Sequence, residues 1–164
     1  MNLRDGERLG ILAGEGSLPL RVARNARAQG LEPVAVTFSA RTAEDLAPLS
    51  SAVLTCGLGQ TGKVVRFLHA EGVRAVVFVG KLEKRVLYRN PSFDLRAVRV
   101  LRRLKDRRDD SIMRAIIEEM ESEGFHVLPQ AEFLGDLFPE AGVLSKRSPT
   151  AREREDLAFG FEMA

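Results

Sequence analysis

Three glycine-rich turns are the features of this chain best suited to binding anions. Each follows a short apolar run, and the three are Gly14-Glu15-Gly16, Gly57-Leu58-Gly59 and Gly80-Lys81. A glycine turn between a strand and a helix lets backbone N–H groups and the positive end of the helix approach a phosphate closely. The three turns therefore predict a binding edge for a phosphorylated ligand.

The first turn matches a dinucleotide-binding fingerprint only in part. Gly14 and Gly16 have the spacing of its first two glycines, but Pro19 stands in place of the third. No Asp or Glu closes the following apolar run to hold a ribose, whereas Ser39 and Arg41 could accept a 2′-phosphate. NADP binding and a tight turn without a ligand therefore both remain open.

The second turn continues as Gln60-Thr61-Gly62-Lys63 and falls one residue short of a Walker A loop. Val64 occupies the position of the Ser or Thr that would ligate magnesium, and the next apolar run ends in Gly80 rather than in an aspartate. An ATPase would therefore lack both metal ligands. The glycines, the helix N-terminus and Lys63 can still cradle a phosphate, or Lys63 can be a solvated surface lysine.

Two charged segments offer further candidates. Asp109 and Asp110 stand just before an apolar-periodic helix, where they can cap that helix, or lie near a metal ion or a sugar hydroxyl. Basic residues interleave with apolar ones over 95–108, which predicts a basic amphipathic helix. Its basic face is either the solvated outside of a packed helix or a contact for anionic lipid headgroups. His69 and His126 have no second ligand at metal spacing and are interpreted as structural.

Alternating strands and helices must position these residues. Apolar runs predict strands at 9–13, 33–38, 53–56 and 75–79. A helix is expected after each of the first two glycine turns, with Ser17 as the cap of the first, and one or two helical turns are expected near 42–45. The second half predicts helices at 93–105, 111–123, 131–138 and 151–163, and a strand at 125–128. This order is typical of a Rossmann-like, three-layer α/β domain with a mainly parallel sheet and a helix-rich C-terminal part.

Composition limits the class of protein. The 164 residues suffice for one domain over 1–164, in which 151–164 can begin a linker helix. With 45% apolar and 29% charged residues and no long apolar run, the chain reads as globular rather than membrane-spanning. The N-terminus has no signal-peptide pattern and Cys56 is the single cysteine, so we expect a cytoplasmic protein. A net charge of +2 is too small to indicate nucleic-acid binding.

Five blocks of sequence, taken together and in this order, indicate a protein family more specifically than any single block does. They are 10–19 (GILAGEGSLP), 57–63 (GLGQTGK), 79–81 (VGK), 108–111 (RDDS) and 142–150 (GVLSKRSPT). This set resembles the N-terminal domain of the LpxI family, the bacterial UDP-2,3-diacylglucosamine diphosphatases of lipid A synthesis. The resemblance extends over nearly the whole chain.

The resemblance implies a magnesium-dependent hydrolase that splits the diphosphate of UDP-2,3-diacylglucosamine into UMP and lipid X, the acylated sugar 1-phosphate. It implies a substrate held between two domains, and a catalytic aspartate in a Gly-Thr-Asp segment of the C-terminal domain that this sequence lacks. We therefore expect the chain alone to be inactive, and we assign no catalytic residue and no metal ligand. The candidates for binding the substrate or shaping its cleft are Gly14, Glu15, Gly16, Leu18, Gly57, Gly59, Gln60, Lys63, Gly80, Lys81, Asp109, Asp110 and Arg147.

The expected partners are the substrate or lipid X, a C-terminal domain of the family type, and peripherally the cytoplasmic face of the inner membrane. Two other functions remain open. One is a non-catalytic module that binds a nucleotide or a sugar phosphate, and the other is an NADP-dependent oxidoreductase.

Overall fold

The computed structural model describes the chain over residues 3–81, 93–102 and 109–163. The chain divides into two compact units, Met1–Leu134 and Gly135–Ala164. The first unit carries the sheet and its helices, and the second carries a loop and one helix. That 1–164 form a single domain stays a prediction.

The first unit is built on a five-stranded sheet in the order β3-β2-β1-β4-β5, and every neighbouring pair of strands is parallel. The strands are β1 Arg8–Ala13, β2 Glu32–Thr37, β3 Ala52–Thr55, β4 Ala75–Val79 and β5 His126–Leu128. β1 is central, since Ile11 pairs with Ala35 of β2 on one side and with Val77 of β4 on the other. The chain builds outward from β1 to β3 and then returns to β4, so the strand order reverses between β1 and β4.

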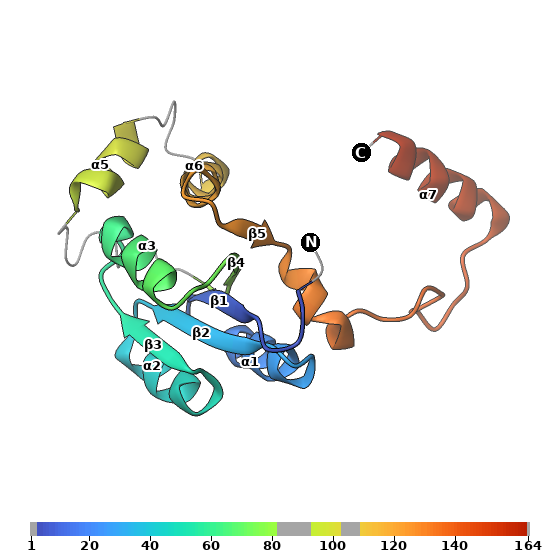
Figure 1. Cartoon of the computed structure of the whole chain (residues 1–164). Helices are drawn as coiled ribbons and strands as arrows, with labels where there is room; N and C mark the ends of the chain where they lie inside the picture. The colour runs from blue at the N-terminus through green and yellow to red at the C-terminus, as the bar shows by residue number, and fades with distance from the viewer. Residues whose placement is uncertain (1–2, 82–92, 103–108, 164) are drawn as a thin grey trace. The chain divides into compact units, whose positions relative to one another are not determined.

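Helices cover both faces of this sheet (Figure 1). The α1 helix Leu18–Ala28 and the α2 helix Ala40–Leu46 lie on one face. The α3 helix Thr61–Ala70 and the α6 helix Asp109–Ser122 lie on the other, and the α5 helix Leu95–Arg102 contacts both of them. Together with the sheet, these helices make three layers.

Two buried apolar clusters explain why the strands are nearly continuous apolar runs. Ile11 belongs to the cluster under α1, and the next residue, Leu12, belongs to the cluster under α3 and α6. Successive side chains of a strand point to opposite faces, so a strand covered on both faces needs apolar residues at every position. The prediction of a Rossmann-like α/β fold with a mainly parallel sheet is confirmed.

The prediction that Ser17 caps α1 is wrong. Its backbone is helical (φ −85°, ψ −17°) and its side chain makes no capping hydrogen bond. A capping residue normally has an extended backbone, which aims its hydroxyl at the N–H groups of the first turn. The backbone carbonyl of Ser17 still accepts a hydrogen bond from the Arg21 N–H at 3.2 Å.

Two other helix boundaries differ from the predictions. The helix expected at 131–138 is instead two short 3₁₀ segments, Gln130–Phe133 and Gly135–Leu137. Phe133 and Leu134 are both buried, so two adjacent side chains enter the core where a helix would turn one of them away. The α6 helix begins at Asp109, so Asp109 and Asp110 lie within its first turn rather than ahead of it.

The second unit contains the short Gly135–Leu137 segment, a loop, and the α7 helix Ala151–Met163. The predicted helix at 151–163 is thus confirmed. Its apolar side chains are exposed, as at Leu157, Phe159, Phe161 and Met163. In the part of the chain that the structure describes, no helix is both long and apolar enough to cross a membrane.

Candidate functional site

The site is built at the carboxyl edge of the sheet. Since all five strands are parallel, the three glycine turns, which follow β1, β3 and β4, leave the sheet at the same edge. The first and third turns flank the point between β1 and β4 where the strand order reverses. In open α/β sheets this reversal creates the crevice in which ligands bind.

The first and third turns are joined by their backbones. The Glu15 N–H donates to the Lys81 carbonyl at 2.8 Å, and the Lys81 N–H donates to the Glu15 carbonyl at 2.9 Å. Just before them, the Gly14 N–H donates to the Val79 carbonyl at 2.8 Å. Sequence reasoning proposed two separate phosphate turns, whereas the structure contains one paired unit, which we call the switch-point turn (residues 14–16 and 80–81).

Two glycines make this close pairing possible. A Cβ on Gly14 would lie 2.6 Å from the Lys81 carbonyl oxygen, and one on Gly80 would lie 2.9 Å from the Glu15 carbonyl oxygen. Gly80 also has a φ of +92°, a backbone conformation that residues with side chains rarely adopt. Any side chain at either position would push the two turns apart.

The outer part of the switch-point turn is open. Gly16 has a φ of +104°, yet a Cβ there would meet nothing within 4 Å. Glu15, Gly16 and Lys81 are exposed, while Leu18 is half-buried against the core at the start of α1. The turn thus combines the positive end of a helix and the exposed ammonium group of Lys81, which favour an anion, with the exposed carboxylate of Glu15, which opposes one.

The second turn is closed by its own side chain. The Gly57 N–H donates to the Gln60 side-chain oxygen at 3.2 Å, and the Lys63 and Val64 N–H groups donate to the Gln60 carbonyl at 3.0 and 3.1 Å. Gln60 therefore shapes the entry to α3 through both its backbone and its side chain. Gly59 is buried within the same loop.

An aspartate that sequence reasoning did not single out occupies the N-terminus of α3. The Asp94 carboxylate accepts the Gly62 N–H at 2.6 Å with one oxygen and the Ala97 N–H at 2.8 Å with the other. Its own N–H donates to the Gly59 carbonyl at 2.8 Å. Asp94 thus caps α3 and α5 together. Its position just before the helix at Leu95 was a visible capping signal, but its reach to Gly62 was not.

Lys63 is exposed on the first turn of α3, and its charge acts on Cys56. Burial raises the pKa of the Cys56 thiol, and the positive charge of Lys63 partly opposes that rise. Cys56 is buried at the end of β3 as part of the apolar cluster under α3, as expected for a small core residue.

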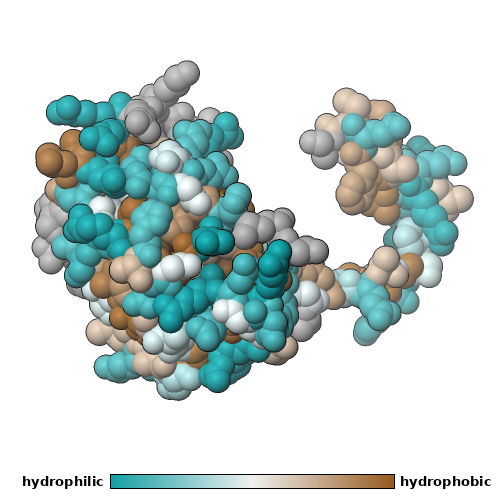
Figure 2. All heavy atoms as spheres, viewed as in Figure 1, coloured by the Kyte–Doolittle hydropathy of each residue, from teal (hydrophilic) through white to brown (hydrophobic). Residues whose placement is uncertain are grey.

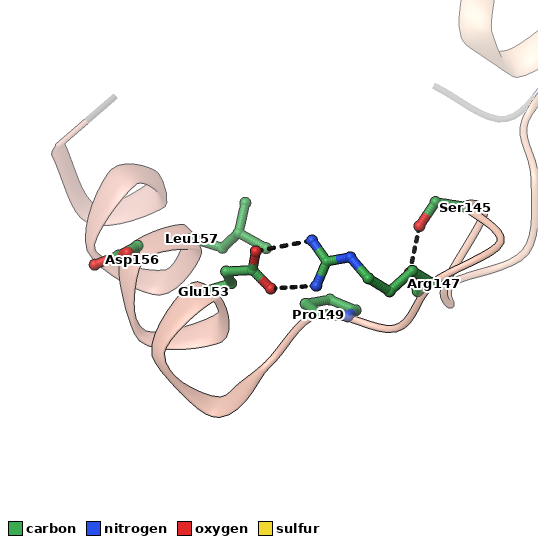
Figure 3. Close-up of a pocket in the computed structure, with 6 residues that line it drawn as sticks. All are labelled: Ser145, Arg147, Pro149, Glu153, Asp156 and Leu157. Carbon is green, nitrogen blue, oxygen red and sulfur yellow. Dashed lines mark hydrogen bonds and ion pairs between the residues drawn. The ribbon is translucent and has the colours of Figure 1, made fainter.

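Arg147 lies in the second unit, where it forms a two-pronged ion pair. Its two terminal nitrogens each lie 2.8 Å from an oxygen of Glu153 (Figure 3). Thr150 and Glu153 also cap the start of α7 reciprocally, through Thr150 N–H to carboxylate at 2.8 Å and Glu153 N–H to hydroxyl at 3.3 Å. Together, Arg147 and Thr150 lower the pKa of Glu153 to about 2.

A pocket of about 440 Å³ surrounds this ion pair within the second unit. Its lining residues are Ser145, Arg147, Pro149, Glu153, Asp156 and Leu157 (Figure 3). The pocket is shaped largely by the cap of α7, because Arg147 and Glu153 are already paired with each other. We therefore take it as the structural end of a helix rather than as the binding site.

The candidate residues fall into separate groups. The switch-point turn unites Gly14, Glu15, Gly16, Gly80 and Lys81, and the α3 entry unites Gly57, Gly59, Gln60 and Lys63. The side chains of Asp109 and Asp110 lie outside the described part of the chain. Across the described residues, no group of three or more His, Cys, Asp or Glu side chains could hold a metal ion.

Comparison with known proteins gives one family and one curated relative. The family described as the LpxI N-terminal domain matches residues 8–137. The relative, "UDP-2,3-diacylglucosamine pyrophosphatase LpxI" of Caulobacter vibrioides, is 28% identical over 165 residues. That alignment covers 96% of this chain and 56% of the relative, so the chain spans about half the relative's length.

Solved structures of similar fold include two enzymes crystallised with nucleotides. The UDP-glucose-4-epimerase of Stenotrophomonas maltophila, with bound NAD and formylated UDP-arabinopyranose, is 12% identical with a TM-score of 0.49, covering 75% of this chain and 36% of that one. The enzyme WbmG of Bordetella bronchiseptica, in complex with NAD and UDP, is 18% identical with a TM-score of 0.49, covering 76% and 37%.

Proposed function

This chain belongs to the LpxI N-terminal domain family, and from that premise we propose that it is the substrate-binding half of a UDP-2,3-diacylglucosamine pyrophosphatase. The whole enzyme would hydrolyse the diphosphate bridge, adding water across one P–O bond to release UMP and lipid X. The observation that carries the proposal is the family match over 8–137, which includes every glycine turn of the carboxyl edge.

The geometry of the switch-point turn supports a diphosphate as the bound group. Its open side offers the positive end of α1 next to Gly16 and the exposed ammonium of Lys81. Cleavage of a diphosphate builds negative charge on the leaving phosphate, and fixed donors and cations stabilise that charge. We assign the first phosphate contact to this turn, because the N-terminus of α3 already holds the Asp94 carboxylate.

The α3 entry supplies the second part of the proposed site. Lys63 is exposed there, and Gln60 holds the loop that presents it. In this proposal the exposed Lys63 contributes a second positive charge at the same sheet edge as Lys81. Arg147, Asp109 and Asp110 stay candidates for shaping the cleft, as their place in the family blocks suggests.

Magnesium belongs to the proposal for the whole enzyme, where it would neutralise the diphosphate and polarise the P–O bond. Its ligands would include the oxygens of the diphosphate itself. The catalytic groups would come from a C-terminal domain, and the chain alone would be inactive. We further propose that the enzyme lies in the cytoplasm, in peripheral contact with the inner membrane. Its diacylated substrate would come from a lipid layer, and its acylated product would return to one.

The test uses a two-domain protein in which this chain is followed by a domain that carries the Gly-Thr-Asp segment. With magnesium and detergent-dispersed UDP-2,3-diacylglucosamine, we expect release of UMP, measured by phosphorus NMR. The chain alone should release none. Absence of hydrolysis by the two-domain protein would overturn the proposed function. Hydrolysis by the chain alone would overturn the assignment of catalysis to the C-terminal domain.

A variant pair tests the assigned contacts. Lys81→Ala and Lys63→Ala in the two-domain protein should each raise KM by about tenfold or more, since a charge-assisted contact to phosphate is lost. Arg24→Ala, an exposed residue on α1, is the matched control and should leave KM unchanged. Saturable binding of NADP(H) by the chain, together with no binding of UDP, would favour the oxidoreductase instead.

A further inference from the structure

The α5 helix is held against the body by contacts on one of its sides. Asp94 ties its first turn to the N-terminus of α3 through the hydrogen bonds described above. Arg96 forms ion pairs with Glu119, at 3.4 Å, and with Glu123, both on or beside α6. Ala97 and Val100 are 5% and 7% exposed. These contacts fix which side of α5 faces the protein.

The opposite side of α5 combines cationic and apolar side chains. Leu95, Arg99 and Arg102 are spaced by four and three residues, which places them on one face of a helix. All three are exposed, Leu95 to 87% of its surface, and Phe93 just before the helix is 37% exposed. Figure 2 shows an apolar projection among hydrophilic atoms over α5. We call Phe93, Leu95, Arg99 and Arg102 the α5 face.

Basic residues are concentrated in the part of the sequence that contains α5. The segment 81–108 contains eleven Lys and Arg residues and three Asp and Glu residues, although the whole chain carries a net charge of only +2. The remainder of the chain is therefore net acidic. A local basic segment on an otherwise acidic chain would orient the protein toward a negatively charged surface.

We propose that the α5 face docks on an anionic lipid surface, with Arg99 and Arg102 at the headgroups and Leu95 and Phe93 in the interfacial layer. This deepens the proposed function and rests on it, because a diacylated substrate would be drawn from such a surface. An exposed Leu and Phe beside arginines fit a lipid interface, where apolar groups leave water while cations meet headgroup phosphates. A nucleic-acid backbone would use the arginines but leave Leu95 in water.

The test is flotation of the purified chain with vesicles, in low salt and without substrate. We expect binding to phosphatidylethanolamine vesicles that contain about one third phosphatidylglycerol, and loss of that binding at about 0.5 M salt. Vesicles of phosphatidylcholine alone should bind the chain at least about tenfold more weakly. Equal binding to both kinds of vesicle, or to neither, would overturn the proposal.

Charge-reversal variants test whether the α5 face is the surface that binds the vesicles. Arg99→Glu/Arg102→Glu should weaken binding to the anionic vesicles by at least about 20-fold, because each lost arginine removes roughly fivefold and each glutamate adds repulsion. Arg24→Glu/Arg74→Glu makes the same change in net charge at exposed positions outside 81–108, and should change binding by less than about threefold. If both double variants weaken binding equally, net charge rather than the α5 face is responsible and the proposal fails.

The apolar part has its own variant, Leu95→Ser, which keeps the charge and should weaken vesicle binding about threefold to tenfold. Unchanged circular dichroism and thermal unfolding would show that all variants are folded. Tighter binding of the chain to RNA than to the anionic vesicles would overturn the lipid assignment. Hydrolysis of detergent-dispersed substrate by the two-domain Arg99→Glu/Arg102→Glu protein should be unchanged, so failure of the surface and failure of the function are distinguishable.

Discussion

Three glycines belong to the switch-point turn, and each meets a different constraint. Gly14 has no positive φ but lacks room for a Cβ, and Gly16 has room but a φ of +104°. Gly80 has both limitations. Glycine is therefore required at this turn for three different reasons: a lack of room for a side chain at Gly14, a positive φ at Gly16, and both at Gly80.

Alanine substitutions separate these effects. We expect Gly16→Ala to lower the free energy of unfolding by about 1 kcal/mol through backbone strain alone. Gly14→Ala should lower it by about 2–3 kcal/mol, because a backbone oxygen 2.6 Å away must move, and Gly80→Ala by at least as much. Urea unfolding of the chain measures all three. An equal loss for Gly14→Ala and Gly16→Ala would contradict the steric origin.

The lowered pKa of Glu153 predicts that the stability of the cap at the start of α7 depends on pH. Its pKa is lowered from 4.5 to about 2 by Arg147 and Thr150, so it favours the folded cap when ionised. That contribution is complete above pH 4.5 and is lost as the pH falls through about 2. Carboxylate NMR titration should report the low pKa, and Arg147→Met should raise it toward the ordinary value. A low pKa that persists in this variant would exclude the ion pair as its main cause.

At the scale of elements, one aspartate joins two helices that are far apart in sequence. Asp94→Ala removes an acceptor from the Gly62 N–H of α3 and from the Ala97 N–H of α5. Each lost cap lowers helix stability by about 1 kcal/mol, so we expect a loss of about 2 kcal/mol in the free energy of unfolding. Asp45→Ala, on the exposed side of α2, is the control and should stay within about 0.5 kcal/mol. Equal effects of the two variants would contradict the double cap.

The strands and most helices could be predicted from sequence, because a strand buried on both faces leaves an unbroken apolar run such as 75–79. Residue types alone gave wrong helix boundaries where the backbone conformation and the packing determine the structure. Ser17 has a capping side chain but a helical backbone, and Phe133 and Leu134 enter the core together. Those boundaries follow from packing, which a local pattern does not contain.

The candidate site could be predicted as a set of turns but not as an assembly. Glycine spacing indicated three turns at one sheet edge, and the parallel topology places them there. The pairing of Glu15 with Lys81 and the reach of Asp94 to Gly62 join residues 66 and 32 positions apart. Such contacts depend on the tertiary fold, so spacing within one segment carries no sign of them.

At the scale of the whole molecule, both buried clusters belong to the first unit. No described residue of 135–163 is fully buried, whereas residues up to Leu134 make up the core. We therefore expect a chain that ends at Leu134 to lose less than about 1 kcal/mol of its free energy of unfolding, measured in urea with the full chain as reference. A loss of several kcal/mol would show that 135–164 stabilise the sheet.

The central position of β1 also sets an order of events during synthesis. β1 is synthesised before the other four strands and can pair with β2 once Thr37 has been made, but its other edge must wait for Val79 of β4. At about 5–20 residues per second, the intervening chain takes about 2–8 s to synthesise. For that time an apolar strand edge of the nascent protein is open to wrong partners. The strand at the middle of the finished sheet is thus the one for which a pause in translation, or a chaperone at the ribosomal exit, has the greatest consequence.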